Sequence, residues 1–258
     1  MALGRNSGFG RRQQEWAITA NSRVNTMDNA AVDEGLRAYM LRVYSYMAGG
    51  LALAGAVCLF LASQPQLVIG MINSGFYLIF FIAWIIFSFI APRMMMTKSV
   101  ATAQIVFWID AALWGVAIAP TITAYLLDPT MVSTIARAFF ITAAMFAGLS
   151  LYGYTTKRNL GPIAAFAMMA IIGVLLVMIV NMIFFQDTGL HLLISFAVVG
   201  LFSIMTAFQT QQIKEMYYAT ASDDDVTRFA VFGASQLIGS FIILFLYILQ
   251  ILAALRGE

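Results

Sequence analysis

Histidine and cysteine are nearly absent from this sequence, and charged residues are scarce. Only 10% of the 258 residues are charged, against about a quarter in an average soluble domain. The single cysteine, Cys58, can form no internal disulfide bond, and with the single histidine, His191, it supplies no cluster of metal ligands. The chain also has no serine–histidine or cysteine–histidine catalytic pattern and no glycine-rich phosphate loop. These absences predict a protein that is not an enzyme and that holds neither a metal nor another cofactor.

Long apolar runs take up most of the sequence, which is 62% hydrophobic and has a mean hydropathy of +0.87. A helix needs roughly 20 apolar residues to cross the ~30 Å hydrocarbon core of a membrane. Seven runs are long enough, at about residues 41–62, 76–95, 100–119, 134–154, 162–184, 190–210 and 229–252. Because the runs are continuous rather than alternating, they predict helices. The fold class is therefore an all-α membrane protein with seven transmembrane helices.

The chain divides into an N-terminal arm and a membrane domain. Residues 1–34 are polar, lack apolar periodicity and contain no apolar stretch typical of a cleaved signal peptide. They predict a mobile cytoplasmic arm, and residues 35–258 predict one seven-helix transmembrane domain. From Ala31 to Tyr44 apolar residues recur at helical spacing, which favours an interfacial helix leading into the first span.

The positions of the basic residues predict the orientation in the membrane. Of the 14 lysine and arginine residues, 12 fall in the first 42 residues and in three loops on the same side, while Arg137 and Arg256 fall on the other. Positive residues mark the cytoplasmic side, so the N-terminus is predicted to be cytoplasmic. Seven complete spans would place the C-terminal tail outside, whereas a re-entrant last helix would return it to the cytoplasm.

Asp110 is the one acidic or basic residue that the predicted spans place near the middle of the membrane. An ionisable side chain at this depth is expensive and usually faces the protein interior or a water-filled cavity. Two interpretations stay open, a functional acid and a protonated structural acid bonded to a neighbouring helix. The polar groups expected to reach it are Gln104, Asn181, Gln209 and Ser240.

Three adjacent carboxylates, Asp223, Asp224 and Asp225, precede the last apolar run. They lack the alternating ligands, the central glycine and the terminal glutamate of a calcium-binding loop. Together with Ser222 they suit the N-terminal turn of a helix instead.

Four motifs, in this order and spacing, carry a resemblance to a known family. They are Leu36-Arg37-Ala38-Tyr39-Met40, the run from Ser150 to Arg158 (SLYGYTTKR), Ile213-Lys214-Glu215-Met216-Tyr217 and Leu244-Phe245-Leu246-Tyr247. Over about residues 31–255 the chain resembles the bacterial branch of the Bax inhibitor-1 family, also called the transmembrane Bax inhibitor motif family. The resemblance implies six helices around a central seventh, in the bacterial cytoplasmic (inner) membrane.

The resemblance also implies a pH-sensitive calcium-leak channel in which two buried aspartates share a proton. Two close carboxylates cannot both ionise cheaply, so such a pair titrates as a unit and can gate a path. Here the two aspartate positions hold Gln209, within Phe208-Gln209-Thr210-Gln211, and Ser240, followed two residues on by Ile242-Ile243. Neither side chain ionises near neutral pH or offers the negative charge that binds calcium.

We therefore expect Gln209 and Ser240 to face one another in the bundle core and, with Asp110, to be the candidate residues of an ion pathway or gate. Arg93 and Lys98 are expected basic partners on the cytoplasmic side. Calcium conduction and pH gating are predicted to be weakened or lost. The alternative is a non-transporting regulator of a membrane protease or another membrane complex. The expected partners are the lipid bilayer and calcium or another cation, with no nucleic acid.

Overall fold

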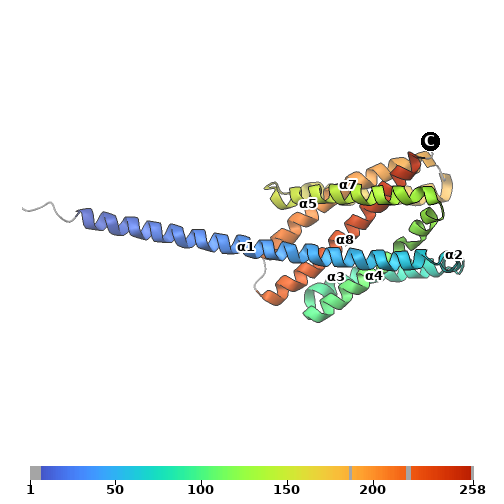
Figure 1. The fold of residues 1–258 in the computed structure, drawn as a ribbon. Helices are drawn as coiled ribbons and strands as arrows, with labels where there is room; N and C mark the ends of the chain where they lie inside the picture. The colour runs from blue at the N-terminus through green and yellow to red at the C-terminus, as the bar shows by residue number, and fades with distance from the viewer. Residues whose placement is uncertain (1–6, 186–187, 219–221, 257–258) are drawn as a thin grey trace, which may run out of the picture. The chain divides into compact units, whose positions relative to one another are not determined.

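The computed structural model of the chain describes residues 7–185, 188–218 and 222–256. The described residues form helices and no strands (Figure 1). They belong to two compact units, Met1–Leu41 and Arg42–Glu258. Seven of the described helices are long and apolar enough to cross a membrane. The predicted all-α class with seven spans is confirmed.

The described helices follow one another with short connections. Their bounds are α1 (Ser7–Ala62), α2 (Pro65–Asn73), α3 (Phe76–Thr97), α4 (Val100–Leu126), η1 (Pro129–Met131), α5 (Val132–Thr155), α6 (Gly161–Val180), η2 (Asn181–Phe185), α7 (Thr188–Tyr218) and α8 (Asp223–Ala254). The short helix α2 and the π-helix η2 were not predicted from the sequence.

Helix α1 begins much earlier than the sequence pattern indicated. It starts at Ser7, so the predicted arm is helical over residues 7–34, and the helix runs on without a break into the first candidate span, Glu34–Ala62. The mobility and the cytoplasmic position of the arm stay predictions.

Local chemistry explains where several helices begin. Gly75 adopts φ +73° before α3, a left-handed conformation that a side chain disfavours. Ser99 caps α4 by accepting a hydrogen bond from the Thr102 N–H. Before η1, Asp128 accepts the Thr130 N–H, and the hydrogen bonds from Thr130 hold the pKa of this exposed carboxyl below its usual range.

Helix α8 is the central helix. Half of its most apolar window is buried inside the protein, compared with 44% for α4 and 11% for α3 and α6. It packs against α3, α4, α5 and α7, and the Tyr247 hydroxyl reaches the sulfur of Met178 on α6 at 3.4 Å. Ile238 touches α1 at Gly50. The expected arrangement of six spans around a seventh is confirmed.

Glycines allow α1 and α4 to approach closely. A Cβ atom on Gly115 of α4 would lie 2.5 Å from the main-chain oxygen of Ala54, and a Cβ on Gly50 would lie 2.9 Å from the Phe107 ring. Small residues permit such contacts between membrane helices, where packing rather than the hydrophobic effect drives association. Gly50 and Gly115 therefore allow α1 and α4 to pack closely.

Candidate functional site

Gln209 on α7 and Ser240 on α8 are in direct contact. The Ser240 hydroxyl donates a 2.7 Å hydrogen bond to the Gln209 side-chain oxygen. Ser240 is buried at 2% exposure, and Gln209 is partly buried. The predicted juxtaposition of these two side chains is confirmed. The contact joins the central helix to α7 through two groups that carry no charge and do not ionise near neutral pH.

The position of Gln209 is fixed by close packing between α7 and α5. Gly153 of α5 lies against the main chain of Ala207, so closely that a Cβ atom there would overlap the Ala207 carbonyl. Gln211, also buried, accepts the Leu160 N–H at 2.9 Å and donates to the Arg158 carbonyl at 2.8 Å. The α7 segment around Gln209 is thus attached to the end of α5 and to the turn that follows it.

A chain of hydroxyl groups lies beside Gln209. The Tyr44 hydroxyl of α1 is 2.5 Å from Ser150 Oγ on α5, which is 3.0 Å from Thr210 Oγ1 on α7. Thr210 Oγ1 is also 3.0 Å from the Thr206 carbonyl oxygen, to which it can donate. In each of the two hydroxyl pairs either group can be the donor. The chain joins α1, α5 and α7.

Asp110 on α4 faces the protein interior, as expected, at 7% exposure. Its Oδ2 accepts a 2.7 Å hydrogen bond from the Ser235 hydroxyl on α8. Ser235 is a polar group on a neighbouring span, as expected, but it is not one of the four residues that the sequence analysis named. Gln104, which was among them, donates instead to the Tyr46 hydroxyl at 2.7 Å.

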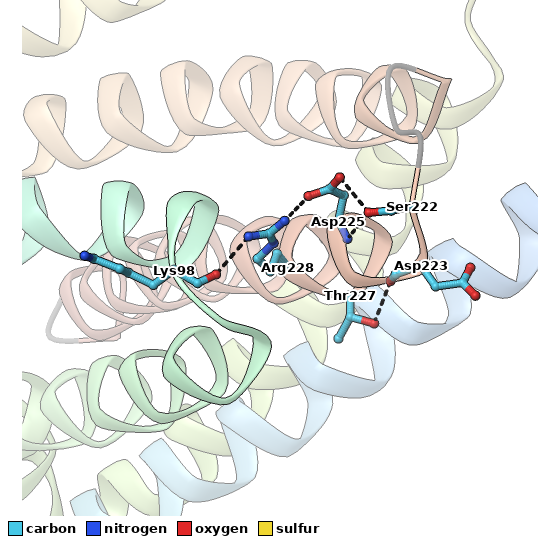
Figure 2. Close-up of polar contacts among 6 residues, drawn as sticks. All are labelled: Lys98, Ser222, Asp223, Asp225, Thr227 and Arg228. Carbon is cyan, nitrogen blue, oxygen red and sulfur yellow. Dashed lines mark hydrogen bonds and ion pairs between the residues drawn. The ribbon is translucent and has the colours of Figure 1, made fainter.

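The first turn of α8 forms a polar junction (Figure 2). The Ser222 hydroxyl caps the helix by accepting the Asp225 N–H and donates to the Asp225 carboxylate at 2.7 Å, which confirms the helix-start interpretation of the acidic run. Arg228 pairs with Asp225 and donates to the Lys98 carbonyl at 2.9 Å. Arg42 donates to the Thr227 hydroxyl at 2.9 Å. Helix α8 is thereby joined to α1 and to the turn between α3 and α4.

The opposite end of α8 is attached by a second arginine. Arg256 donates to the Thr130 carbonyl and, at 2.8 Å, to the buried Thr134 hydroxyl near the start of α5. One turn inside this end, Gln250 accepts a 3.2 Å hydrogen bond from Ser195 on α7.

The predicted basic partners lie away from the Gln209–Ser240 contact. The side chains of Arg93 and Lys98 are exposed, and no described hydrogen bond or ion pair connects either to Gln209 or Ser240. What Lys98 contributes is its main-chain carbonyl, which sequence reasoning could not single out (Figure 2). Within residues 34–256, apart from the segments not described, no group of three or more histidine, cysteine or acidic side chains could hold a metal ion.

Seven apolar helices, one of them central and joined to its neighbours by buried polar contacts, define an integral membrane protein. Residues 36–257 match the family described as inhibitor of apoptosis-promoting Bax1. This match covers most of the chain, which therefore belongs to the Bax inhibitor-1 family.

Bacterial relatives agree with this assignment. The chain is 34% identical over 233 residues to a protein of Rickettsia prowazekii, covering 90% of this chain and 96% of the relative. It is 33% identical over 230 residues to a protein of Caulobacter vibrioides, covering 85% and 90%. It is also 30% identical over 220 residues to inner membrane protein YbhL of Escherichia coli, covering 84% and 92%.

Proposed function

We propose that this protein is a bacterial inner-membrane relative of calcium-leak channels in which calcium conduction and pH gating are weakened or lost. The observation that carries the proposal is the 2.7 Å hydrogen bond from Ser240 to Gln209. These two residues occupy the positions where the family resemblance implies a pair of aspartates that share a proton. Two side chains that do not titrate near neutral pH therefore occupy the positions of a pair that would.

Because the contact carries no charge, it is poorly suited to bind calcium. A calcium ion is bound by six to eight oxygen ligands, usually with carboxylates among them, which replace its water. Gln209 and Ser240 offer neutral oxygens, and the Ser240 proton already occupies one side of the Gln209 oxygen. Since no proton can be gained or lost here near neutral pH, the contact gives the protein no means of opening or closing in response to pH.

A second candidate function is regulation of a membrane protease or another membrane complex without transport. The same neutral contact favours this second function, because the hydrogen bond between α7 and α8 stabilises one arrangement of the bundle. In either case we propose that the lipid bilayer surrounds the seven spans and that the protein has no catalytic activity and no nucleic-acid partner.

The orientation is also part of the proposal. We place the N-terminus in the cytoplasm, because 12 of the 14 lysine and arginine residues would then lie on the cytoplasmic side. Localisation to the inner membrane is supported by the relative YbhL, whose name describes an inner membrane protein.

Calcium flux into liposomes tests the proposal. The purified protein is reconstituted with a calcium-sensitive dye inside, and influx is followed in a series from pH 6 to pH 8 against empty liposomes. We expect weak flux that is nearly flat with pH. Strong influx that changes several-fold over this range would overturn the proposal. Flux no higher than in empty liposomes would favour the regulator.

A further inference from the structure

Asp110 lies where three spans meet. Its carboxyl accepts the Ser235 hydroxyl of α8 at 2.7 Å, and the Trp84 indole N–H of α3 lies close to it. This indole nitrogen is buried and makes no hydrogen bond to any described group. The Trp84 ring packs edge-on against Trp114, one turn after Asp110 on α4, with the ring centres 4.6 Å apart.

The two donors around this carboxyl have different roles. The Ser235 hydroxyl donates a hydrogen bond to the carboxyl, whereas the Trp84 N–H lies close to the carboxyl but makes no described hydrogen bond. A buried polar group without a partner costs about 1–3 kcal/mol, and a membrane interior has no water to supply one. A carboxylate can accept bonds on both oxygens, whereas a protonated carboxyl has one fewer acceptor position. The number of donors that Asp110 can satisfy therefore depends on whether it holds a proton.

No described charged side chain forms an ion pair with Asp110. Within Arg42–Glu258, the described ionisable side chains on the neighbouring helices are Arg42, Tyr44, Tyr46 and Cys58 on α1, Tyr77, Arg93 and Lys98 at or beside α3, Tyr125 on α4, Arg137, Tyr152 and Tyr154 on α5, and Asp223, Asp224, Asp225, Arg228 and Tyr247 on α8. None of them makes a described hydrogen bond or ion pair with Asp110. Several are bonded elsewhere: Tyr46 to Gln104 and Tyr77 to the Val116 carbonyl.

We propose that Asp110, Ser235 and Trp84 form a proton-binding site that couples α3 to α4 and α8. With the proton bound, the carboxyl is neutral, accepts the Ser235 hydroxyl and leaves the Trp84 N–H unpaired. When the O–H bond breaks and the proton is released to the bulk solvent outside the membrane, the carboxylate accepts both donors, which draws the Trp84 side chain onto it. The site is separate from the Gln209–Ser240 contact and holds whether or not the protein conducts ions.

Infrared difference spectroscopy of the full chain in lipid nanodiscs tests this site. A protonated buried carboxyl has a C=O stretching band that disappears on ionisation. We expect one such band to vanish as the pH rises from 5 to 10, and to be absent from Asp110→Asn at every pH. The control Asp224→Asn removes an exposed acid in the first turn of α8 and should leave the band and its midpoint unchanged. If no band changes with pH, or if the Asp110→Asn protein keeps it, the proposal fails.

Trp84→Phe tests the coupling, because it keeps an aromatic ring and removes the N–H donor. The variant should move the midpoint of the band to higher pH, since the carboxylate loses one of its two donors. Ser235→Ala should move the midpoint in the same direction, and it keeps the test decisive if Asp110→Asn does not fold. A midpoint unaffected by either change would overturn the assignment of these donors. The double variant Gln209→Leu with Ser240→Ala should leave the midpoint unchanged, which separates this site from the proposed function.

Discussion

Gly153 on α5 packs against the main-chain carbonyl of Ala207 on α7, two residues before Gln209. Adding a methyl group here must push the two helices apart, because the atoms it meets are backbone atoms. We expect Gly153→Ala to lower the free energy of unfolding by at least the ~1–3 kcal/mol typical of overpacking. Thermal unfolding in detergent measures this loss of stability. Gly148→Ala on the same helix, whose added Cβ meets nothing within 4 Å, should be neutral or slightly stabilising.

Ser240→Ala should destabilise the bundle by about 1 kcal/mol, because it removes a buried hydrogen bond and leaves the Gln209 oxygen without its donor. Unfolding in a denaturing detergent series measures the change. The matched control is Ser203→Ala on α7, where the hydroxyl bonds to the Val199 carbonyl of its own helix. Equal losses in the two variants would show that the contact between α7 and α8 contributes no stability of its own.

Tyr44→Phe should weaken the attachment of α1 to α5 and α7. The Tyr44 hydroxyl is hydrogen-bonded to Ser150, so the variant removes this bond and should cost about 1 kcal/mol. The control Tyr152→Phe removes an exposed hydroxyl from α5. Thermal unfolding compares the stability of the two proteins, and a Tyr44→Phe protein as stable as Tyr152→Phe would show that the hydroxyl chain does not stabilise the attachment of α1.

Restoring two acids should make calcium flux depend on pH. Gln209→Asp combined with Ser240→Asp would place two carboxyls on α7 and α8 at positions that now touch, and such a pair titrates as a unit. We expect calcium flux in liposomes to vary several-fold between pH 6 and pH 8. The single variant Ser240→Asp, which has no second carboxyl at the contact, is the control. Flat flux from the double variant would mean that another part of the bundle, such as Ile243, keeps the path closed.

Arg228→Gln should loosen the first turn of α8 without unfolding the protein. The guanidinium is partly exposed, with 21% of the side chain accessible, so its ion pair with Asp225 contributes little to the stability of the fold. The lost bond to the Lys98 carbonyl should instead appear as faster hydrogen exchange in the first turn of α8 and in the turn between α3 and α4. Asp224→Asn, which changes an exposed acid of the same turn, should leave exchange unaltered.

The sequence predicts the spans and the Gln209–Ser240 contact because each depends on a signal that can be read locally. An apolar run of sufficient length indicates a span, and a motif resemblance places the two residues at known positions. The hydroxyl chain could not be predicted, since Tyr44 is 106 residues from Ser150 and Ser150 is 60 from Thr210. No periodicity connects residues so far apart.

The partner of Asp110 was missed for a related reason. The expected partners were residues with amide side chains and residues of the family motifs. The contact is made instead by Ser235, a small residue beside Gln236 in an apolar helix. The acid could be placed in the interior because burial follows from its depth in a span. Its partner depends on the rotation of α8 relative to α4, which a single sequence does not reveal.

The arginines at the two ends of α8 restrict how the central helix can move. Arg228 is bonded to the turn between α3 and α4, and Arg256 to the start of α5. A displacement of α8 along its own axis, in either direction, would break one of these attachments and strain the other. Movement of α8 along its axis would therefore cost these bonds, whereas rotation or tilting of the outer helices about α8 need not break them.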